Sequence, residues 1–369
     1  MNEKRLLALL ASRSSLFLSA WAVACTSKPN VPPPAIVIPA TADTIVGAYN
    51  LASAAVPRSD GTWIVLAPEE GAVLEAGFAA KTLVPHRGIT KAEVPGPTVL
   101  IGVGDTVVVG DWGRQRFTTW LASGAQVAAV PVPAALAGAF PQARDAAGQW
   151  YFEIGPPPGR DGIGLRDSAA IVRSDAALAR FDTIARLAPV DLAEVVTNEG
   201  SRLTRRALGG HDQWGVERDG ALWIVRVDQN YFEWYPPGGG KKSKGPRLPD
   251  PVLTVQDMDR QIFVRRFPED YRASALQVPF AVIKPPFAAV LPAGPGMWLL
   301  EKNGLALDST RTFQVVDKRG VVRRVTVPSR GNALGFSGTH LLMTEQFPGG
   351  VRLLRYALPA EVVVARAED

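Results

Sequence analysis

The sequence predicts an all-β fold, a six-bladed β-propeller of four-stranded antiparallel blades, preceded by a signal peptide and a Pro-rich tether. Three observations predict it. Of the 369 residues, 47% are hydrophobic and only 20% are charged, which is enough apolar material for a large core. The 35 glycines and 31 prolines are spread between short apolar runs, as in a fold with many tight turns. One pattern of turns and strands also recurs along most of the chain.

Residues 1–24 have the order of a secretory signal peptide. Lys4, Arg5 and Arg13 precede an apolar stretch that ends at Ala24 and is too short to span a bilayer comfortably. The next residue is Cys25, the only cysteine in the chain. Because this cysteine stands directly after the expected cleavage point, we predict that it is lipidated; the alternative is simple cleavage that leaves a free thiol.

The segment AVAC, which ends at Cys25, resembles the lipobox of bacterial lipoproteins, although Ala22 stands where that family usually has leucine. Thr26, rather than aspartate, resembles lipoproteins sorted to the outer membrane. Residues 25–41 are therefore predicted to be a lipid-attachment cysteine and a Pro-rich linker. We expect an exported protein of the periplasm or outer membrane, which contacts the membrane through this anchor only.

Residues 42–369 are predicted to form the propeller. The copies of the repeat are aligned by one aromatic or apolar residue after a turn, namely Trp63, Val107, Trp150, Trp223, Trp298 and Leu341. Three steps between these positions are 43 or 44 residues, which suits a four-stranded blade, and the two longer steps contain insertions near Gly159 and Gly239. One sheet cannot bury both faces alone, so we expect the sheets to stack around a ring with Trp63, Trp223 and Trp298 between them.

A ring of sheets must also be closed by one of the chain ends. Two segments are candidates for the closing strand, residues 42–50 near the N-terminus and residues 361–367 near the C-terminus. The sequence does not distinguish between them.

One repeat carries a family resemblance. The segment DTVVVGDWGRQRFTTWLASG, which starts at Asp105 and contains Asp111, resembles an NHL repeat. The segment DGALWIVRVDQNYFEWYPPGG resembles a weaker second copy, with Asp228 and Asn230 in its turn. Residues 42–367 as a whole resemble bacterial six-bladed propellers of the NHL and TolB-like type. The resemblance implies the fold and says little about function, because such propellers host both enzymes and binding scaffolds.

An acidic residue follows the second strand of each copy. These residues are Glu69, Asp111, Glu153, Asp228, Glu301 and Glu345. Several of them could meet at one end of the central channel and hold a hard cation such as Ca²⁺, which binds carboxylate and carbonyl oxygens from different segments. The candidates for this metal or ligand site are Asp111, Asp228, Asn230 and Glu301. The alternative is that the acidic residues cap turns or pair with neighbouring arginines.

Other catalytic arrangements are not favoured by the sequence. His86, His211 and His340 fall at three different positions of the repeat, so they are not expected to converge on a zinc ion. The chain also lacks the G-x-S-x-G motif of serine hydrolases.

Two unusual loops are the predicted partner contacts, because loops tend to carry function. The first contains Arg160 and Asp161, and the second contains Lys241, Lys242 and Lys244. The formal net charge of +5 falls to +3 without residues 1–24, which hold three cations and one anion. A chain this mildly basic is not expected to bind nucleic acid.

These features favour a non-catalytic binding or scaffold propeller of the cell envelope. We expect it to engage a protein, a peptide or a glycan through loops at one end of the ring. The alternative is a metal-dependent hydrolase or lyase, resembling propeller lactonases, with carboxylate and asparagine ligands at the channel mouth.

Overall fold

The structure is a computed structural model that describes residues 33–155, 168–197, 200–250, 252–265, 267–304 and 308–363. These residues belong to one compact unit, Pro33–Asp369. The predicted signal peptide, Cys25, Arg160 and Asp161 lie outside the described residues. Among the described helices, none is both long enough and apolar enough to cross a membrane.

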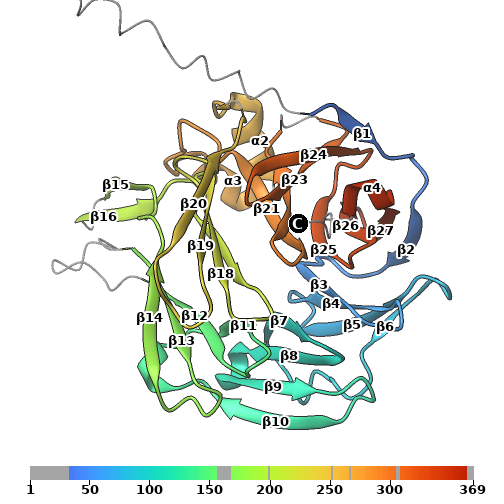
Figure 1. Cartoon of the computed structure of the whole chain (residues 1–369). Coiled ribbons are helices and arrows are strands. Elements are labelled where there is room, and N and C mark those ends of the chain that lie inside the picture. Colours follow the sequence, from blue (N-terminus) through green and yellow to red (C-terminus); the bar gives the residue numbers. More distant parts are fainter. Residues whose placement is uncertain are drawn as a thin grey trace, which may run out of the picture. The chain divides into compact units, whose positions relative to one another are not determined.

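The described residues form an all-β fold of repeated four-stranded antiparallel sheets, as expected of a propeller (Figure 1). The first three sheets are β3 (Ala54–Pro57), β4 (Trp63–Ala67), β5 (Ala72–Gly77), β6 (Thr82–Pro85); β7 (Pro97–Val103), β8 (Thr106–Asp111), β9 (Arg116–Trp120), β10 (Gln126–Pro131); and β11 (Pro141–Arg144), β12 (Trp150–Ile154), β13 (Ala170–Ser174), β14 (Phe181–Arg186). In each sheet the strands follow one another in sequence order, so a tight turn joins most neighbours.

Three further sheets complete the set. They are β17 (Gln213–Val216), β18 (Leu222–Arg226), β19 (Tyr231–Tyr235), β20 (Ser243–Arg247); β21 (Phe287–Gly294), β22 (Met297–Lys302), β23 (Arg311–Asp317), β24 (Gly320–Val327); and β25 (Asn332–Phe336), β26 (His340–Phe347), β27 (Gly350–Ala357) with β2 (Asp43–Gly47). The six aligned positions of the repeat all lie on second strands, at Trp63, Val107, Trp150, Trp223, Trp298 and Leu341, as the repeat predicted.

The first strand of each sheet contacts the first strand of the next. The order of contact is β3, β7, β11, β17, β21 and β25, and β25 returns to β3. The last approach is very close, because a Cβ atom on Gly335 of β25 would lie 2.5 Å from the carbonyl oxygen of Ala55 and 3.0 Å from the Trp63 ring. Glycine is required there because no larger residue fits between the two strands.

The hydrophobic core consists of six clusters, each packed between two neighbouring sheets. Trp63 is packed between the first and last sheets, whereas Trp223 and Trp298 share the cluster between β17–β20 and β21–β24. Trp298 is fully buried, and its ring centroid lies 6.1 Å from that of Trp223. These tryptophans are core residues between sheets, as predicted. Because second strands bury both faces, β4 is buried at every residue and shows no alternation.

The N-terminal candidate supplies the closing strand. β2 pairs antiparallel with β27, and Ile45 at its centre is 2% exposed. The C-terminal candidate does not, because its described part belongs to a short helix, α4 (Ala360–Val363). The predicted tether also needs correction, since β1 (Ala35–Val37) pairs parallel with β24 and Ile38 is buried. Residues 35–38 are therefore part of the folded unit, because the segment pairs with this sheet and Ile38 is buried.

The second insertion differs from the prediction, whereas Gly159, which marked the first, lies outside the described residues. The long step before Trp223 contains a separate hairpin, β15 (Leu192–Thr197) and β16 (Gly200–Arg205). The long step before Trp298 contains two helices, α2 (Asp257–Arg265) and α3 (Glu269–Leu276), whereas Gly239 only turns the chain between β19 and β20. The two insertions contact each other, because the Ala207 N–H donates to the Pro279 carbonyl over 2.8 Å.

Candidate functional site

The four residues predicted to bind a metal lie on three different sheets. Asp111 ends β8, is fully buried, and accepts a 3.1 Å hydrogen bond from the Gly96 N–H. Arg116 lies 3.8 Å from its other oxygen, so the alternative expectation of an arginine partner holds for this residue. Asp228 is exposed in the turn between β18 and β19.

Glu301 and Asn230 are buried, and they belong to two neighbouring sheets. Glu301 on β22 lies 3.6 Å from the Arg311 guanidinium, and burial raises its pKa. Asn230 has a φ of 51° and donates a 3.0 Å hydrogen bond to Asp250. Within the described part of the chain, no group of three or more His, Cys, Asp or Glu side chains is placed to hold a metal ion.

Two other members of the six repeated acidic residues accept hydrogen bonds from a neighbouring segment. Glu153 accepts a 2.7 Å hydrogen bond from the indole N–H of Trp214, which is on the next sheet. Glu345 accepts a 2.9 Å hydrogen bond from the Ser329 hydroxyl. These half-buried carboxylates therefore join adjacent strands and loops through hydrogen bonds.

The predicted lysine loop forms part of a larger basic surface. The loop leads into β20, the outer strand of its sheet, and β20 contacts β24, the fourth strand of the following sheet. A Cβ atom on Gly320 of β24 would lie 3.1 Å from the ring of Pro246, so the two strands touch. We call the exposed cations of this surface the basic strip: Lys241, Lys242, Lys244, Arg247, Lys318 and Arg319.

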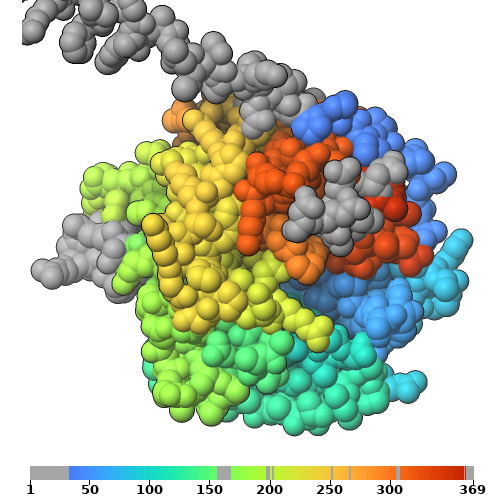
Figure 2. Space-filling view, viewed as in Figure 1, coloured from blue at the N-terminus to red at the C-terminus, as the bar shows by residue number. Residues whose placement is uncertain are grey.

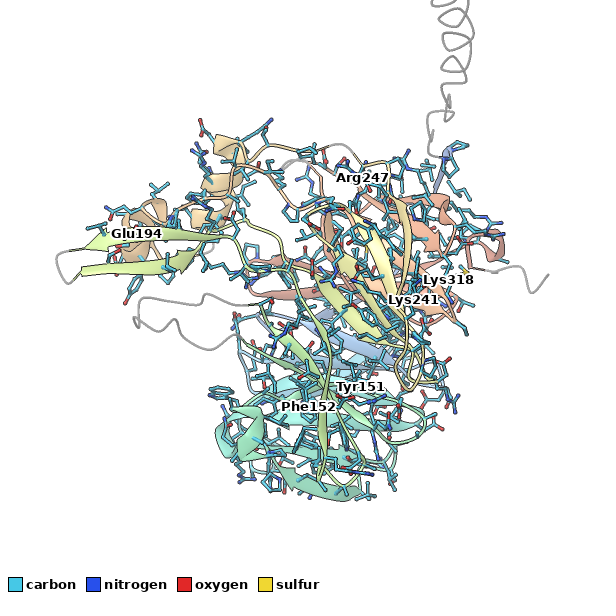
Figure 3. All side chains as sticks on the ribbon, turned by 60° about the vertical axis from the view of Figure 1, so that its left-hand side comes forward. Tyr151, Phe152, Glu194, Lys241, Arg247 and Lys318 are labelled. Atoms are coloured by element: carbon cyan, nitrogen blue, oxygen red, sulfur yellow. The ribbon has the colours of Figure 1, made fainter. Side chains whose placement is uncertain are left out.

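The basic strip follows an edge of the molecule. Figure 3 shows Lys241 and Lys318 toward one end of the two sheets and Arg247 toward the other. In Figure 2 the surface of residues near 240 borders that of residues near 320. Because a strand rises about 3.3 Å per residue, the cations from Lys241 to Arg247 extend over about 20 Å.

Acidic groups near the basic strip are buried or already paired. The segment 229–249 contains one acid, Glu233, and the segment 318–327 contains none. Asp317 is bound by Arg319 at 2.8 Å. Glu217 interacts with Lys318, and burial raises the pKa of this carboxyl. In the described structure, Lys241, Arg247 and Lys318 make no ion pair, and Glu217 offsets part of the charge of Lys318. The charge of Lys241 and Arg247 therefore faces solvent.

A buried ionic network holds β20 against its sheet. Arg226 of β18 donates to Asp212 over 2.6 Å and to Glu233 over 2.6 Å, and Lys242 binds the other Glu233 oxygen at 2.8 Å. Burial opposes the charge of Glu233, but the hydrogen bonds from Lys242 and Arg226 outweigh it and hold its pKa at about 2. The bond to Glu233 also raises the pKa of Lys242. The network therefore fixes one lysine of the basic strip in place.

Lys244 is positioned by a second contact. Its ammonium lies 3.7 Å from the centroid of the Tyr231 ring, which is 9% exposed. A cation above an aromatic face is attracted by the ring quadrupole and remains accessible on its outer side. Sequence reasoning found this lysine loop but missed Lys318 and Arg319, which are about 75 residues away in the chain and only meet it in the fold.

No family model matches the sequence, and comparison with curated proteins finds no match. Several solved structures are similar to it. A calcium-binding protein, regucalcin, from Agrobacterium tumefaciens is 11% identical over 88% of this chain and 98% of its own, with a TM-score of 0.48. Virginiamycin B lyase from Staphylococcus aureus is 11% identical over 86% and 99%, with a TM-score of 0.45.

A gluconolactonase from Xanthomonas campestris is also similar. It is 14% identical over 84% of this chain and 86% of its own, with a TM-score of 0.43. At these identities and TM-scores the likeness assigns neither an activity nor a ligand to this chain.

Proposed function

We propose that the chain is an exported six-bladed β-propeller of the NHL or TolB-like type that acts as a non-catalytic binding protein of the cell envelope. Its ligand is a linear acidic polysaccharide, held along the basic strip. The observation that supports this is the meeting of six cations, from the segment 241–247 and from the turn before β24, beside acids that are buried or paired.

The arrangement favours a polymer over a small anion. One exposed ion pair contributes only about 0.2–1 kcal/mol, so useful affinity needs several contacts at once. The cations are spaced along the segment 241–247 and the turn beside it, which a long chain of carboxylates can follow. Four of the six are lysines. A lysine ammonium binds a carboxylate as a point charge, without the fixed fork geometry of an arginine guanidinium.

The surface also favours a glycan over a single-stranded nucleic acid. Proteins that bind single strands stack the bases on exposed aromatic rings. Tyr231 lies under Lys244, and the half-buried ring of Tyr235 lies 6.0 Å from the Lys242 ammonium. Trp234 is buried in the core. None of these three rings is fully exposed, so a nucleic acid would gain mainly backbone contacts here.

The test compares two variants of equal charge. K241E/K244E/K318E reverses three cations of the basic strip, whereas K81E/K91E/R265E reverses three exposed cations elsewhere. We expect the first variant to bind alginate, a polyuronate, at least tenfold more weakly than the wild type, and the second to lose less than about threefold. The dependence of affinity on salt should also become shallower in the first variant only.

Two results would overturn the proposal. An equal loss in both variants would mean that net charge, and not this surface, controls the interaction. Binding of single-stranded DNA as tight as that of alginate, at the same salt concentration, would mean that the basic strip does not select a glycan.

A further inference from the structure

His86 is a buried imidazole whose polar atoms are unsatisfied. It follows β6 directly and is 2% exposed. Among the described residues, neither of its ring nitrogens has a hydrogen-bond partner of normal geometry, and neither reaches solvent. A neutral imidazole carries one donor and one acceptor, so this position leaves both unused and costs free energy. A buried polar group of this kind needs an explanation beyond core packing.

The charged groups around His86 do not offer a partner for an imidazolium. Arg58, which follows β3, acts on the ring as a second cation, and its side chain is 9% exposed. Glu75 of β5 also acts on the ring, but it is already bound by Arg58 at 3.4 Å. The turn between β9 and β10, residues 121–125, contains no charged residue. Protonation would therefore place a buried cation near another one.

The pKa of His86 reflects this environment. Burial is the largest influence and lowers the pKa, and Arg58 acts in the same direction. The backbone of Arg87 and the carboxylate of Glu75 act against it. The folded protein therefore prefers the neutral ring.

His86 begins a short segment that crosses from the first sheet to the second. We call residues 86–91 the strap. The strap is attached to the first sheet where the His86 N–H donates to a carbonyl of β5 over 2.9 Å. On the second sheet, a Cβ atom on Gly88 would overlap the Gly124 carbonyl oxygen, so the two backbones touch where only glycine fits. Ile89 is 4% exposed and belongs to the core cluster between the two sheets.

The following part of the same loop is fixed to the second sheet. The Arg114 guanidinium donates to the carbonyls of Glu93 and Ala92 over 2.6 and 2.7 Å, and Arg116 donates to Glu93 over 2.8 Å. These bonds do not involve the first sheet. The strap can therefore leave the first sheet while residues 92–96 keep their place.

We propose that the strap is acid-sensitive and opens when His86 gains a proton. The imidazolium has no free acceptor in the buried position, whereas water solvates its charge once the strap is open. Opening removes Ile89 from its core cluster and uncovers apolar side chains between the first and second sheets. The inference goes beyond the proposed function and does not depend on the polysaccharide, because the basic strip belongs to the sheets β17–β20 and β21–β24.

Hydrogen exchange of the whole protein, followed by mass spectrometry, tests this inference. Because the pKa of His86 is lower in the folded state than the ordinary 6.5, the closed strap is fully favoured above about pH 6.5 and is lost as the pH falls through the folded pKa. After correction for the intrinsic pH dependence of exchange, we expect the protection of residues 86–91 to fall at least tenfold between about pH 7.5 and about pH 5. The buried strands β4 and β8 should stay protected.

Two variants separate the imidazole from its surroundings. H86L replaces it with an uncharged side chain of similar volume, so the strap should stay protected at about pH 5 and should be at least as protected as in the wild type at neutral pH. H86Q, which is polar but uncharged, should also abolish the acid response and serves if H86L does not fold. H340Q removes a half-buried histidine of the last sheet and is the matched control, which should respond to acid like the wild type.

Three results would overturn the inference. An equal fall in protection in H86L or H86Q would assign the acid response to another group. A simultaneous loss of protection in all six sheets would mean that His86 affects global stability and not the strap. Titration of His86 by NMR at or above its ordinary pKa, in a strap that remains protected, would show that the charged ring is tolerated in the closed position.

Discussion

Glu233 stabilises the folded protein and also binds Lys242 of the basic strip. It is 3% exposed and binds Arg226 and Lys242, and its pKa of about 2 lies below the ordinary value of 4.5. The folded state therefore prefers the charged form. Its contribution to stability is complete above about pH 4.5 and is lost as the pH falls through 2.

We expect E233Q to lower the free energy of unfolding at pH 7 by about 2–3 kcal/mol, because Arg226 and Lys242 lose an ionic partner. The variant should also lose part of the decline in stability between pH 4.5 and 2. Urea denaturation at a series of pH values measures both effects. E269Q, which changes an exposed carboxylate on α3, serves as the control and should follow the wild type.

Asp111 and Asp228 allow the metal-dependent alternative to be tested. D111A should cost about 1–3 kcal/mol, because the Gly96 N–H loses its acceptor, whereas D228A changes an exposed turn and should stay within about 0.5 kcal/mol. The two residues lie on different sheets and are not expected to share one calcium ion. Any change in Tm that about 1 mM calcium causes should therefore be the same in both variants as in the wild type. A calcium-dependent shift that disappears in both variants would instead support the hydrolase or lyase alternative.

At the scale of elements, β2 has a different role from β1. β2 is the fourth strand of the last sheet, and its Asp43 pairs with Arg355 of β27 at 2.6 Å. β1 is a fifth strand added to a sheet that already has four. Loss of β2 would expose an edge of β27 and uncover the cluster around Ile45, whereas loss of β1 would uncover less.

We therefore expect a chain that begins at residue 51 to be at least about 3 kcal/mol less stable than one that begins at residue 42. Chemical denaturation followed by circular dichroism measures the difference. The chain from residue 42 is the matched control, because it lacks β1 but keeps β2. Equal stability of the two chains would show that β2 does not close the ring.

The sequence predicted the second strands best, for a physical reason. β4, β18 and β22 bury both faces, so they appear as short apolar runs with a tryptophan near the start. The helices α2 and α3 were missed because they are short and mostly exposed, and only two of their apolar residues, Val264 and Ala275, are buried. Acidic residues in both first turns were the available signal for them.

At the scale of the whole molecule, the site was harder to predict than the fold. The repeat spacing is a property of the order of residues along the chain, so it can be found in the sequence alone. The basic strip depends on contact between β20 and β24, which are about 75 residues apart in the chain. Asp111 and Glu301 have arginine partners in their own sheets, Arg116 and Arg311, as the alternative interpretation of these carboxylates expected.

The closing sheet sets the timing of folding in the cell. Asp43 and Arg355 are separated by 312 positions, and they bond to each other across the last sheet. At about 5–20 residues per second, synthesis needs roughly 15–60 s to deliver the partner of β2. During that interval β2 has no partner strand, and the first sheet is not yet packed against the last sheet. Folding of the full ring is therefore post-translational, and a chaperone that shields strand edges should raise its yield more than slower synthesis would.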